Sequence, residues 1–177
     1  MSSAIETIKG LTNTYHAYIF GTAFWYSLRA LCRIIDPAMV AGWFRSPAQA
    51  YLHNLAIEPN DLELYNIRTD AWGLLALALV LLAIADAVPL PRPLTAGSSL
   101  VESSIPAASK KPCARAIVAV TVFHHVMTGV GAYQHWKVPT HRTAAMDVGV
   151  WGNVFFAGLG VAALRWGLRE EGKGKRG

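Results

Sequence analysis

The sequence has few charged residues and few cysteines. Only 15% of its 177 residues are charged, whereas a soluble domain usually has about a quarter. With 53% hydrophobic residues, this shortage disfavours a soluble enzyme, a disordered chain and a nucleic-acid-binding module. Cys32 and Cys113 form no motif, so neither a disulfide framework nor a C-x-x-C redox pair is expected. Weak alternation of apolar and polar residues also disfavours an outer-membrane barrel.

Hydrophobic residues are concentrated in four stretches of roughly 20 residues, a length that matches the hydrocarbon core of a bilayer as a helix. They predict an all-α, integral membrane four-helix bundle in a single domain. Between the first two spans, residues 38–44 are expected at the membrane interface, and Ser46 and Pro47 start a short amphipathic helix that ends near Ile57. The predicted spans are 15–35, 71–88, 114–136 and 144–168, with a mobile Pro/Ser-rich linker over 89–112 and a basic tail over 169–177.

Lysine and arginine are distributed unequally between the two sides of the predicted bundle. The N-terminus, second loop and tail carry about eight, and the first and third loops about four. The positive-inside rule therefore predicts that both termini are cytosolic and that the first and third loops face the lumen or exterior. We expect the endoplasmic reticulum membrane.

Polar side chains recur at helical spacing inside the predicted spans. A helix in lipid needs no polar face unless that face meets protein, water or a ligand, so such stripes mark helix contacts or sites. Antiparallel threading predicts a polar pocket in the lumenal half of the bundle, lidded by residues 38–57. The residues placed in that half come from all four spans: Arg29, Arg33, Asp70, His124, His125, His135 and Asp147.

Each of these residues also has a purely structural interpretation. The arginines would extend to the membrane interface, Asp70 would pair with one of them, and Asp147 would stabilise a helix N-terminus. A neutral histidine would bond a neighbouring backbone or threonine group. Asn153 lies in a row of small residues that favours close helix contact.

Carboxylate, imidazole, guanidinium, phenol and carboxamide groups together form an acid–base set that needs no cofactor. Two carboxylates in different surroundings can divide the roles of acid and base. Such a pair suits the opening of an epoxide, by water or by an internal hydroxyl, or the isomerisation of a double bond in an apolar substrate. The predicted catalytic residues are Asp70, Asp147, His124 and Arg29. The predicted substrate-binding residues are Tyr26, Arg33, His125, His135, Trp151 and Asn153.

Metal or haem binding is a weaker alternative. The six histidines include no H-x-x-x-H or H-E-x-x-H pair, and His124 and His125 are adjacent, so they cannot easily face one ion from a helix. A haem would need ligands on facing helices, and the second and fourth spans contain no histidine. We therefore predict no metal and no cofactor.

Three segments resemble blocks of small four-span membrane proteins of filamentous fungi: 67–75, 123–131 and 147–153. Some of those proteins are encoded among polyketide or meroterpenoid biosynthesis genes and are thought to open or cyclise epoxides or to isomerise intermediates. The resemblance covers about residues 20–165. It implies a cofactor-independent membrane enzyme of secondary metabolism with a hydrophobic substrate, and it identifies neither the substrate nor the reaction.

Two alternatives to an enzyme remain open from the sequence. The stronger is a non-catalytic membrane scaffold or lipid-binding protein, in which the polar groups only fix helix packing. The weaker is a transporter or channel, which at this length would require an oligomer.

Overall fold

The computed structural model describes residues 13–46, 48, 51, 58–85 and 110–169, and these residues form an all-α protein. Most of the predicted helix up to Ile57, of the linker 89–112 and of the basic tail lies outside the described residues. The elements are α2 (Thr14–Ile35), α3 (Pro37–Phe44), α5 (Asp61–Ile84), α6 (Lys111–Trp136), the short 3-10 helix η2 (Pro139–His141), α7 (Ala144–Ala162) and the π-helical turn η3 (Ala163–Gly167).

Local capping residues account for the helix boundaries. Asp36 ends α2, and its side chain accepts a hydrogen bond from the Met39 amide to start α3, with Pro37 at the first helical position. Asn60 and Glu63 form a reciprocal capping box at the start of α5. α2 ends at Ile35, where the first predicted span also ends, and α5 begins at Asp61, ahead of the second predicted span.

Within the described residues, three helices are long and apolar enough to cross a membrane: α5, α6, and α7 continued by η3. Four such helices were predicted, and α2 is not among the three. It has the length, with 22 residues, but its polar side chains, among them His16, Arg29 and Arg33, lower its hydropathy. Large apolar side chains point outward from the three candidates, for example Phe123, Trp151 and Phe155.

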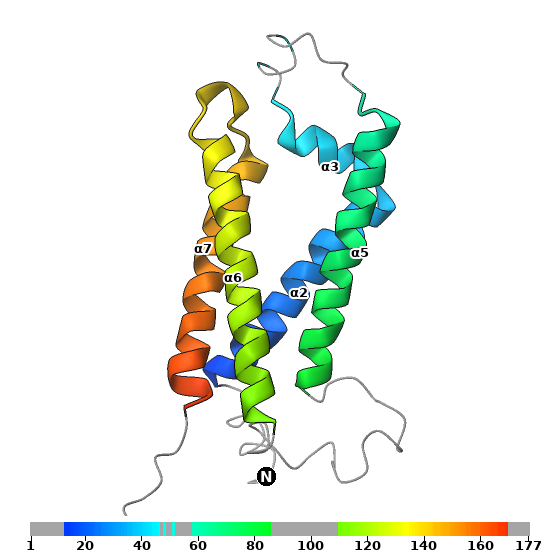
Figure 1. Ribbon diagram of the computed structural model, residues 1–177. Helices are drawn as coiled ribbons and strands as arrows, with labels where there is room; N and C mark the ends of the chain where they lie inside the picture. Colours follow the sequence, from blue (N-terminus) through cyan, green and yellow to red (C-terminus); the bar gives the residue numbers. More distant parts are fainter. Residues whose placement is uncertain (1–12, 47, 49–50, 52–57, 86–109, 170–177) are drawn as a thin grey trace, which may run out of the picture.

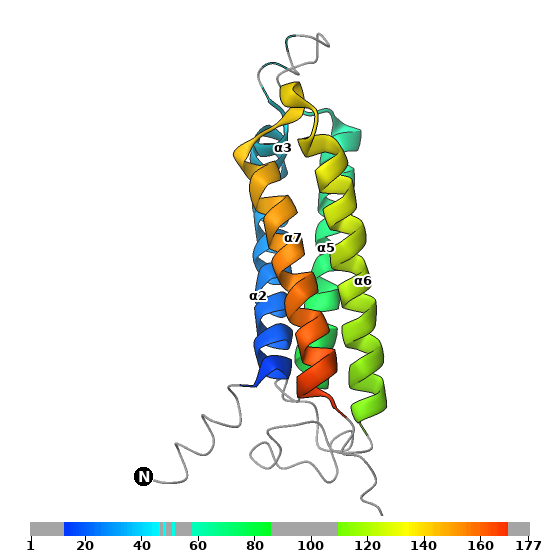
Figure 2. The ribbon, with the colours of Figure 1, turned by 90° about the vertical axis from the view of Figure 1, so that its left-hand side faces the viewer.

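The helices pack as two pairs that are joined at one end. α2 packs along α5, and α6 packs along α7. α2 runs diagonally, from η3 at the lower end of Figure 1 to the upper part of α5, so the two pairs diverge toward the upper end. Figure 2 shows α3 at this upper end, level with the upper parts of the long helices. We call the lower end the closed end and the upper end the splayed end.

Two glycines allow the helices to approach closely at the closed end. A Cβ atom on Gly160 would overlap Val122 and lie 2.7 Å from Cε2 of Tyr18, and one on Gly167 would lie 2.8 Å from the backbone nitrogen of Tyr15. The neighbouring core is fully buried and includes Tyr15, Tyr18, Ile19, Leu81, Val118 and Leu168. Side-chain size at these positions therefore sets how tightly the pairs join.

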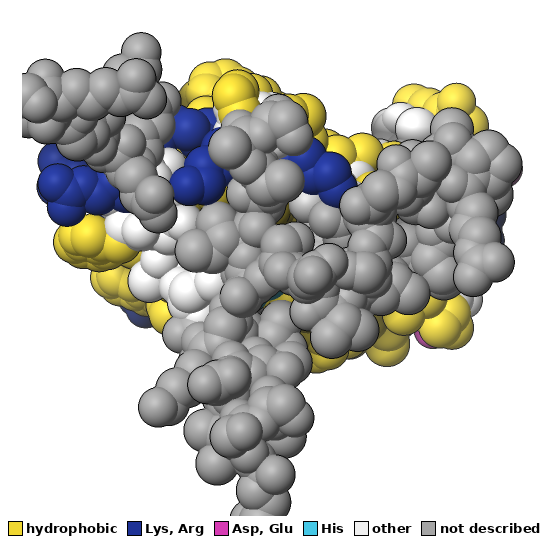
Figure 3. Space-filling view, turned by 90° about the horizontal axis from the view of Figure 1, so that it is seen from below, with side chains coloured by type: hydrophobic (Ala, Val, Ile, Leu, Met, Phe, Trp, Pro, Cys, Tyr) yellow, Lys and Arg dark blue, Asp and Glu magenta, His cyan; other side chains and the backbone are white. Residues whose placement is uncertain are grey.

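Lysine and arginine side chains gather at the closed end, which Figure 3 shows from below. The first residues of α6 and the η3 turn, which lie at this end, include Lys111, Arg115 and Arg165. Arg115 also donates a 2.8 Å hydrogen bond to the carbonyl oxygen of Leu168, which ties the end of η3 to α6.

Candidate functional site

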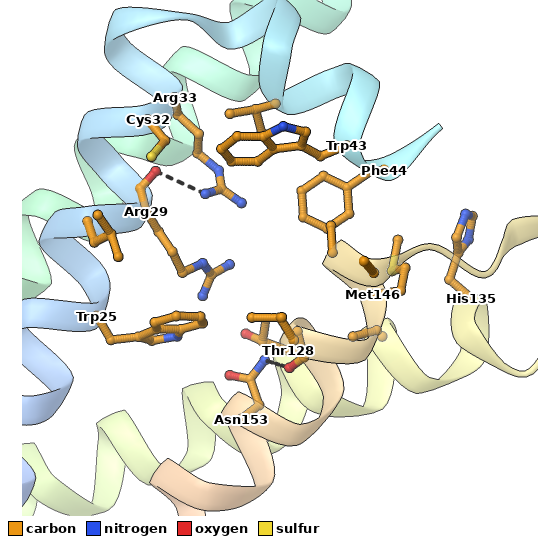
Figure 4. A pocket seen from close by; sticks show the side chains of 18 residues that line it. Trp25, Arg29, Cys32, Arg33, Trp43, Phe44, Thr128, His135, Met146 and Asn153 are labelled. Carbon is orange, nitrogen blue, oxygen red and sulfur yellow. Dashed lines mark hydrogen bonds between the residues drawn. The ribbon is translucent and has the colours of Figure 1, made fainter. Parts of the chain in front are cut away.

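A largely apolar cavity of about 1030 Å³ lies at the splayed end, between α2, α3, α6 and α7. Its volume is at the upper end of the roughly 300–1,000 Å³ usual for small-molecule sites. Trp25, Trp43 and Phe44 supply aromatic walls, and two guanidinium groups, those of Arg29 and Arg33, extend into it (Figure 4). We call it the arginine cavity. None of the described residues that line it is Asp or Glu.

Arg29 enters the arginine cavity without a carboxylate partner. Its guanidinium carbon lies 5.9 Å from the centre of the Trp25 ring. Its Nη1 atom is buried and has no hydrogen-bond partner among the described atoms, and no described carboxylate lies within 4.0 Å of the group. An unpaired charge in an apolar site is costly, so this arrangement is a candidate ligand contact.

Arg33 makes two polar contacts within the protein. Its Nη1 donates to the Arg29 carbonyl oxygen at 3.0 Å, the bond drawn in Figure 4, and its Nε lies 3.1 Å from Oδ2 of Asp70. The Arg33 side chain is 11% exposed and that of Asp70 is 56% exposed. The charge of Arg33 is therefore balanced by α5, and Asp70 is held at the edge of the bundle.

Asp70 lines a second cavity, of about 500 Å³, and does not line the arginine cavity. The two cavities adjoin, since Arg33, Val40, Phe44 and His135 line both. The His135 ring stacks on that of His141, with 4.5 Å between centroids. Asp70 and His135 are therefore the predicted residues that a ligand extending between the cavities would reach.

The adjacent histidines lie next to the cavity and link helices. His124 Nδ1 is 2.8 Å from the Tyr26 hydroxyl, which joins α6 to α2. His125 is fully buried, and its Nδ1 is 3.0 Å from Oδ1 of Asn153 on α7. Asn153 donates through Nδ2 to the Gly149 carbonyl at 2.7 Å, so its oxygen is the acceptor and His125 Nδ1 the donor. Of these four side chains, only Asn153 lines the arginine cavity.

Asp147 lies outside both cavities. Its Oδ1 accepts a 2.6 Å hydrogen bond from Trp136 Nε1 and lies 3.2 Å from Arg142 Nη2, while Arg142 stacks over the Trp136 ring at 4.4 Å. The carboxylate thus fastens the connection between α6 and α7. The predicted meeting of Asp70 and Asp147 in one pocket is wrong in this structure, because helix threading gives the height of a residue along a helix and not the partner that its side chain meets.

Trp151 also departs from its predicted position. Its side chain is 63% exposed on the outer face of α7 and lines neither cavity. The sequence-based prediction missed Trp25, Phe44, Thr128 and Met146, which do line the arginine cavity. Trp25 had a detectable signal, because it precedes Arg29 by one helical turn and therefore shares its face.

The predicted lid is present in part. α3 contributes Val40, Trp43 and Phe44 to the arginine cavity, and Ser46 just beyond it donates a hydrogen bond to the Thr140 carbonyl oxygen. This bond joins the segment after α3 to η2 across the splayed end. Within the described part of the chain, no three His, Cys, Asp or Glu side chains are placed to hold a metal ion together.

Among the described residues, fold and cavity together define an all-α protein with three membrane-compatible helices and a large, partly open cavity at one end. The chain belongs to the family described as domain of unknown function DUF8792, whose model matches residues 18–175. No curated protein and no solved structure matches it.

Proposed function

We propose that this chain is an integral membrane enzyme that binds a hydrophobic small molecule in the arginine cavity and converts it by acid–base chemistry without a cofactor. The observation that carries the proposal is Arg29: a guanidinium with a buried, unbonded nitrogen on the wall of an apolar cavity of about 1030 Å³. Ionisable groups inside a membrane bundle mark functional sites because they are costly without a partner.

In this proposal α2 is a fourth span and both termini are cytosolic, with the endoplasmic reticulum as the membrane. The large exposed apolar side chains of α2, among them Phe24, Leu31 and Ile35, support contact with lipid. The basic residues at the closed end support a cytosolic position for that end under the positive-inside rule.

Epoxide opening, by hydrolysis or cyclisation, is the reaction that we propose first. Asp70 would take the proton of the attacking water or internal hydroxyl as the new C–O bond forms. Arg29 would hold a polar group of the substrate elsewhere in the arginine cavity, while the C–O bond of the epoxide oxygen breaks. His135, which lines both cavities, would return a proton to that oxygen. The substrate would be a hydrophobic intermediate of secondary metabolism, as the fungal resemblance implies.

Gene deletion in the native host with metabolite profiling tests this proposal. Complementation should use the wild-type gene, Asp70→Asn and, as a matched control, Asp147→Asn, which alters a carboxylate outside both cavities. We expect an epoxide to accumulate on deletion, and product to be restored by the wild type and Asp147→Asn only. An unchanged profile on deletion would overturn the enzyme, and restoration by Asp70→Asn would exclude Asp70 as the base.

A non-catalytic lipid-binding protein is the second candidate, and one observation favours it. Asp70 and Asp147 are each paired with an arginine, and no described carboxylate lines the arginine cavity. On this alternative, deletion would leave the metabolite profile unchanged while the purified protein would still retain a bound amphiphile.

A further inference from the structure

We propose that the ligand of the arginine cavity is an amphiphilic monoanion, with a carboxylate or phosphate oxyanion held by Arg29 and an apolar body held by the aromatic walls. This inference rests on the proposed function in taking the arginine cavity as the ligand site. It goes further by assigning the charge of the ligand and the residue that recognises that charge.

The charge of the proposed ligand follows from how the arginines at the splayed end are paired. Three arginines there have carboxylate partners on the protein: Arg33 with Asp70 at 3.1 Å, Arg45 with Glu63 at 2.7 Å, and Arg142 with Asp147 at 3.2 Å. Arg29 has none within 4.0 Å among the described residues, and no described Asp or Glu lines its cavity. The cavity therefore holds one uncompensated positive charge, which a monoanion would balance.

The hydrogen bonds around Arg29 indicate which donors in the cavity could bind the oxyanion of the ligand. The Thr128 hydroxyl already donates to the His124 carbonyl at 2.7 Å, and the Asn153 amide donates to the Gly149 carbonyl at 2.7 Å. Arg29 Nη1 and Trp25 Nε1 are thus buried donors of the cavity wall without a hydrogen-bond partner among the described atoms, and of the two only the Arg29 guanidinium is charged. Figure 4 shows this guanidinium extending between Trp25 and Phe44. A guanidinium binds a carboxylate or phosphate through two parallel hydrogen bonds, a geometry that a neutral ligand oxygen does not reproduce.

The rest of the cavity wall suits an apolar body. Trp25, Trp43, Phe44, Met146 and Val148 line it with aromatic and aliphatic surface. A fully water-soluble anion would leave this surface unfilled, and a fully neutral lipid would leave Arg29 unpaired. An amphiphilic anion satisfies both parts of the site.

Brominated lipids provide a direct test, because bromine quenches tryptophan fluorescence on contact and Trp25 and Trp43 line the cavity. The full chain is placed in neutral phosphatidylcholine nanodiscs and titrated with 9,10-dibromostearic acid and, separately, with its uncharged methyl ester. We expect the acid to bind at least about tenfold more tightly than the ester, as a charge-assisted hydrogen bond allows. Equal binding of acid and ester would overturn the proposal. Trp25→Phe should remove part of the quenching and so locate the probe.

Substitutions of Arg29 test whether this residue causes the preference for the acid over the methyl ester. Arg29→Gln should abolish the preference for the acid, and Arg29→Lys should keep a reduced one, which provides a reading if the glutamine variant does not fold. Arg68→Gln is the matched control, since Arg68 is exposed on α5 and lines neither cavity. A preference that survives Arg29→Gln, or that is lost in Arg68→Gln, would contradict the assignment.

Unbrominated phosphatidylglycerol, whose phosphodiester carries a single negative charge, distinguishes the two sources of the oxyanion. If this lipid displaces the brominated fatty acid, seen as recovery of tryptophan fluorescence, the site is assigned to a bilayer headgroup; if it does not, the site is assigned to a free acid. The outcome is also separate from that of the enzyme proposal. Acid binding with an unchanged deletion profile would overturn the enzyme alone, whereas a neutral accumulated substrate with no acid preference would overturn this inference alone.

Discussion

One face of α2 carries polar side chains along its whole length, and these side chains have different surroundings at the closed and splayed ends of the bundle. Toward the closed end, Tyr18 meets the Thr121 hydroxyl at 2.7 Å, and further along Tyr26 meets His124 at 2.8 Å, so each tyrosine hydroxyl has a partner on α6. One turn beyond Tyr26, Arg29 has the same helical spacing but an unbonded nitrogen and an apolar cavity beside it. Polar side chains at the same helical spacing thus stabilise the packing where the neighbouring helix is close. Where the neighbouring helix is farther away, they are available to bind a ligand.

The difference arises from the size of side chains where the helix pairs meet. Gly160 and Gly167 let α7 and η3 come against Tyr18 and Tyr15, whereas α3 lies at the other end and adds Trp43 and Phe44 between the pairs. Substitutions at the tightly packed closed end and beside the cavity at the splayed end should therefore change the stability of the protein differently.

Gly160→Ala should destabilise the protein by about 1–3 kcal/mol, because the added methyl group would overlap Val122 and press on Tyr18. Thermal unfolding followed by circular dichroism in a mild detergent measures the effect. Gly158→Ala is the control on the same helix, since a Cβ there meets nothing within 4 Å. Equal unfolding temperatures for the two variants would show that the closed end is not tightly packed.

Arg29→Met should stabilise the ligand-free protein by about 1–2 kcal/mol, because it replaces an unpaired, partly buried charge with an apolar chain of similar length. Arg33→Met should give no such gain, because it removes the partner of Asp70. The same unfolding assay, run on delipidated protein, compares them. A loss of stability in Arg29→Met as large as that in Arg33→Met would mean that Arg29 is a structural residue.

Tyr18→Phe should cost about 0.6–1.7 kcal/mol, the range of side-chain hydrogen bonds between helices in membrane proteins. The double variant with Thr121→Val should cost little more than the single one, since both remove the same bond. Tyr133→Phe serves as the control because Tyr133 is exposed. Full additivity of the Tyr18 and Thr121 substitutions would contradict a direct interaction.

Asp147→Asn should lower the unfolding temperature only slightly, because its Arg142 partner is half exposed and the pair is screened by salt. The difference from wild type should shrink further when unfolding is measured at 1 M salt. A large, salt-independent loss would place Asp147 in the core of the site instead of at the connection between α6 and α7.

Much of the secondary structure could be predicted from the sequence, since helix boundaries depend on residues next to one another. α2 ends at Ile35, as the predicted span 15–35 does, because Pro37 follows Asp36 and starts a new helix. The candidate site could be predicted only in part. Arg29, Arg33, His135 and Asn153 do line the arginine cavity, whereas Asp147 and Trp151 do not. Facing partners depend on helix rotation and tilt, which no local pattern encodes.

The sequence by itself determined that the chain is helical, that long apolar helices dominate it and that α2 carries a polar face, because these properties follow from composition and from spacing along one helix. Only the tertiary structure decided which polar groups are satisfied. α2 runs diagonally from η3 to α5, so Tyr18 and Tyr26 reach α6 while Arg29 reaches a cavity (Figures 1 and 4). The crossing of helices brings together residues far apart in the chain, and the distance between those helices separates a packing contact from a binding site.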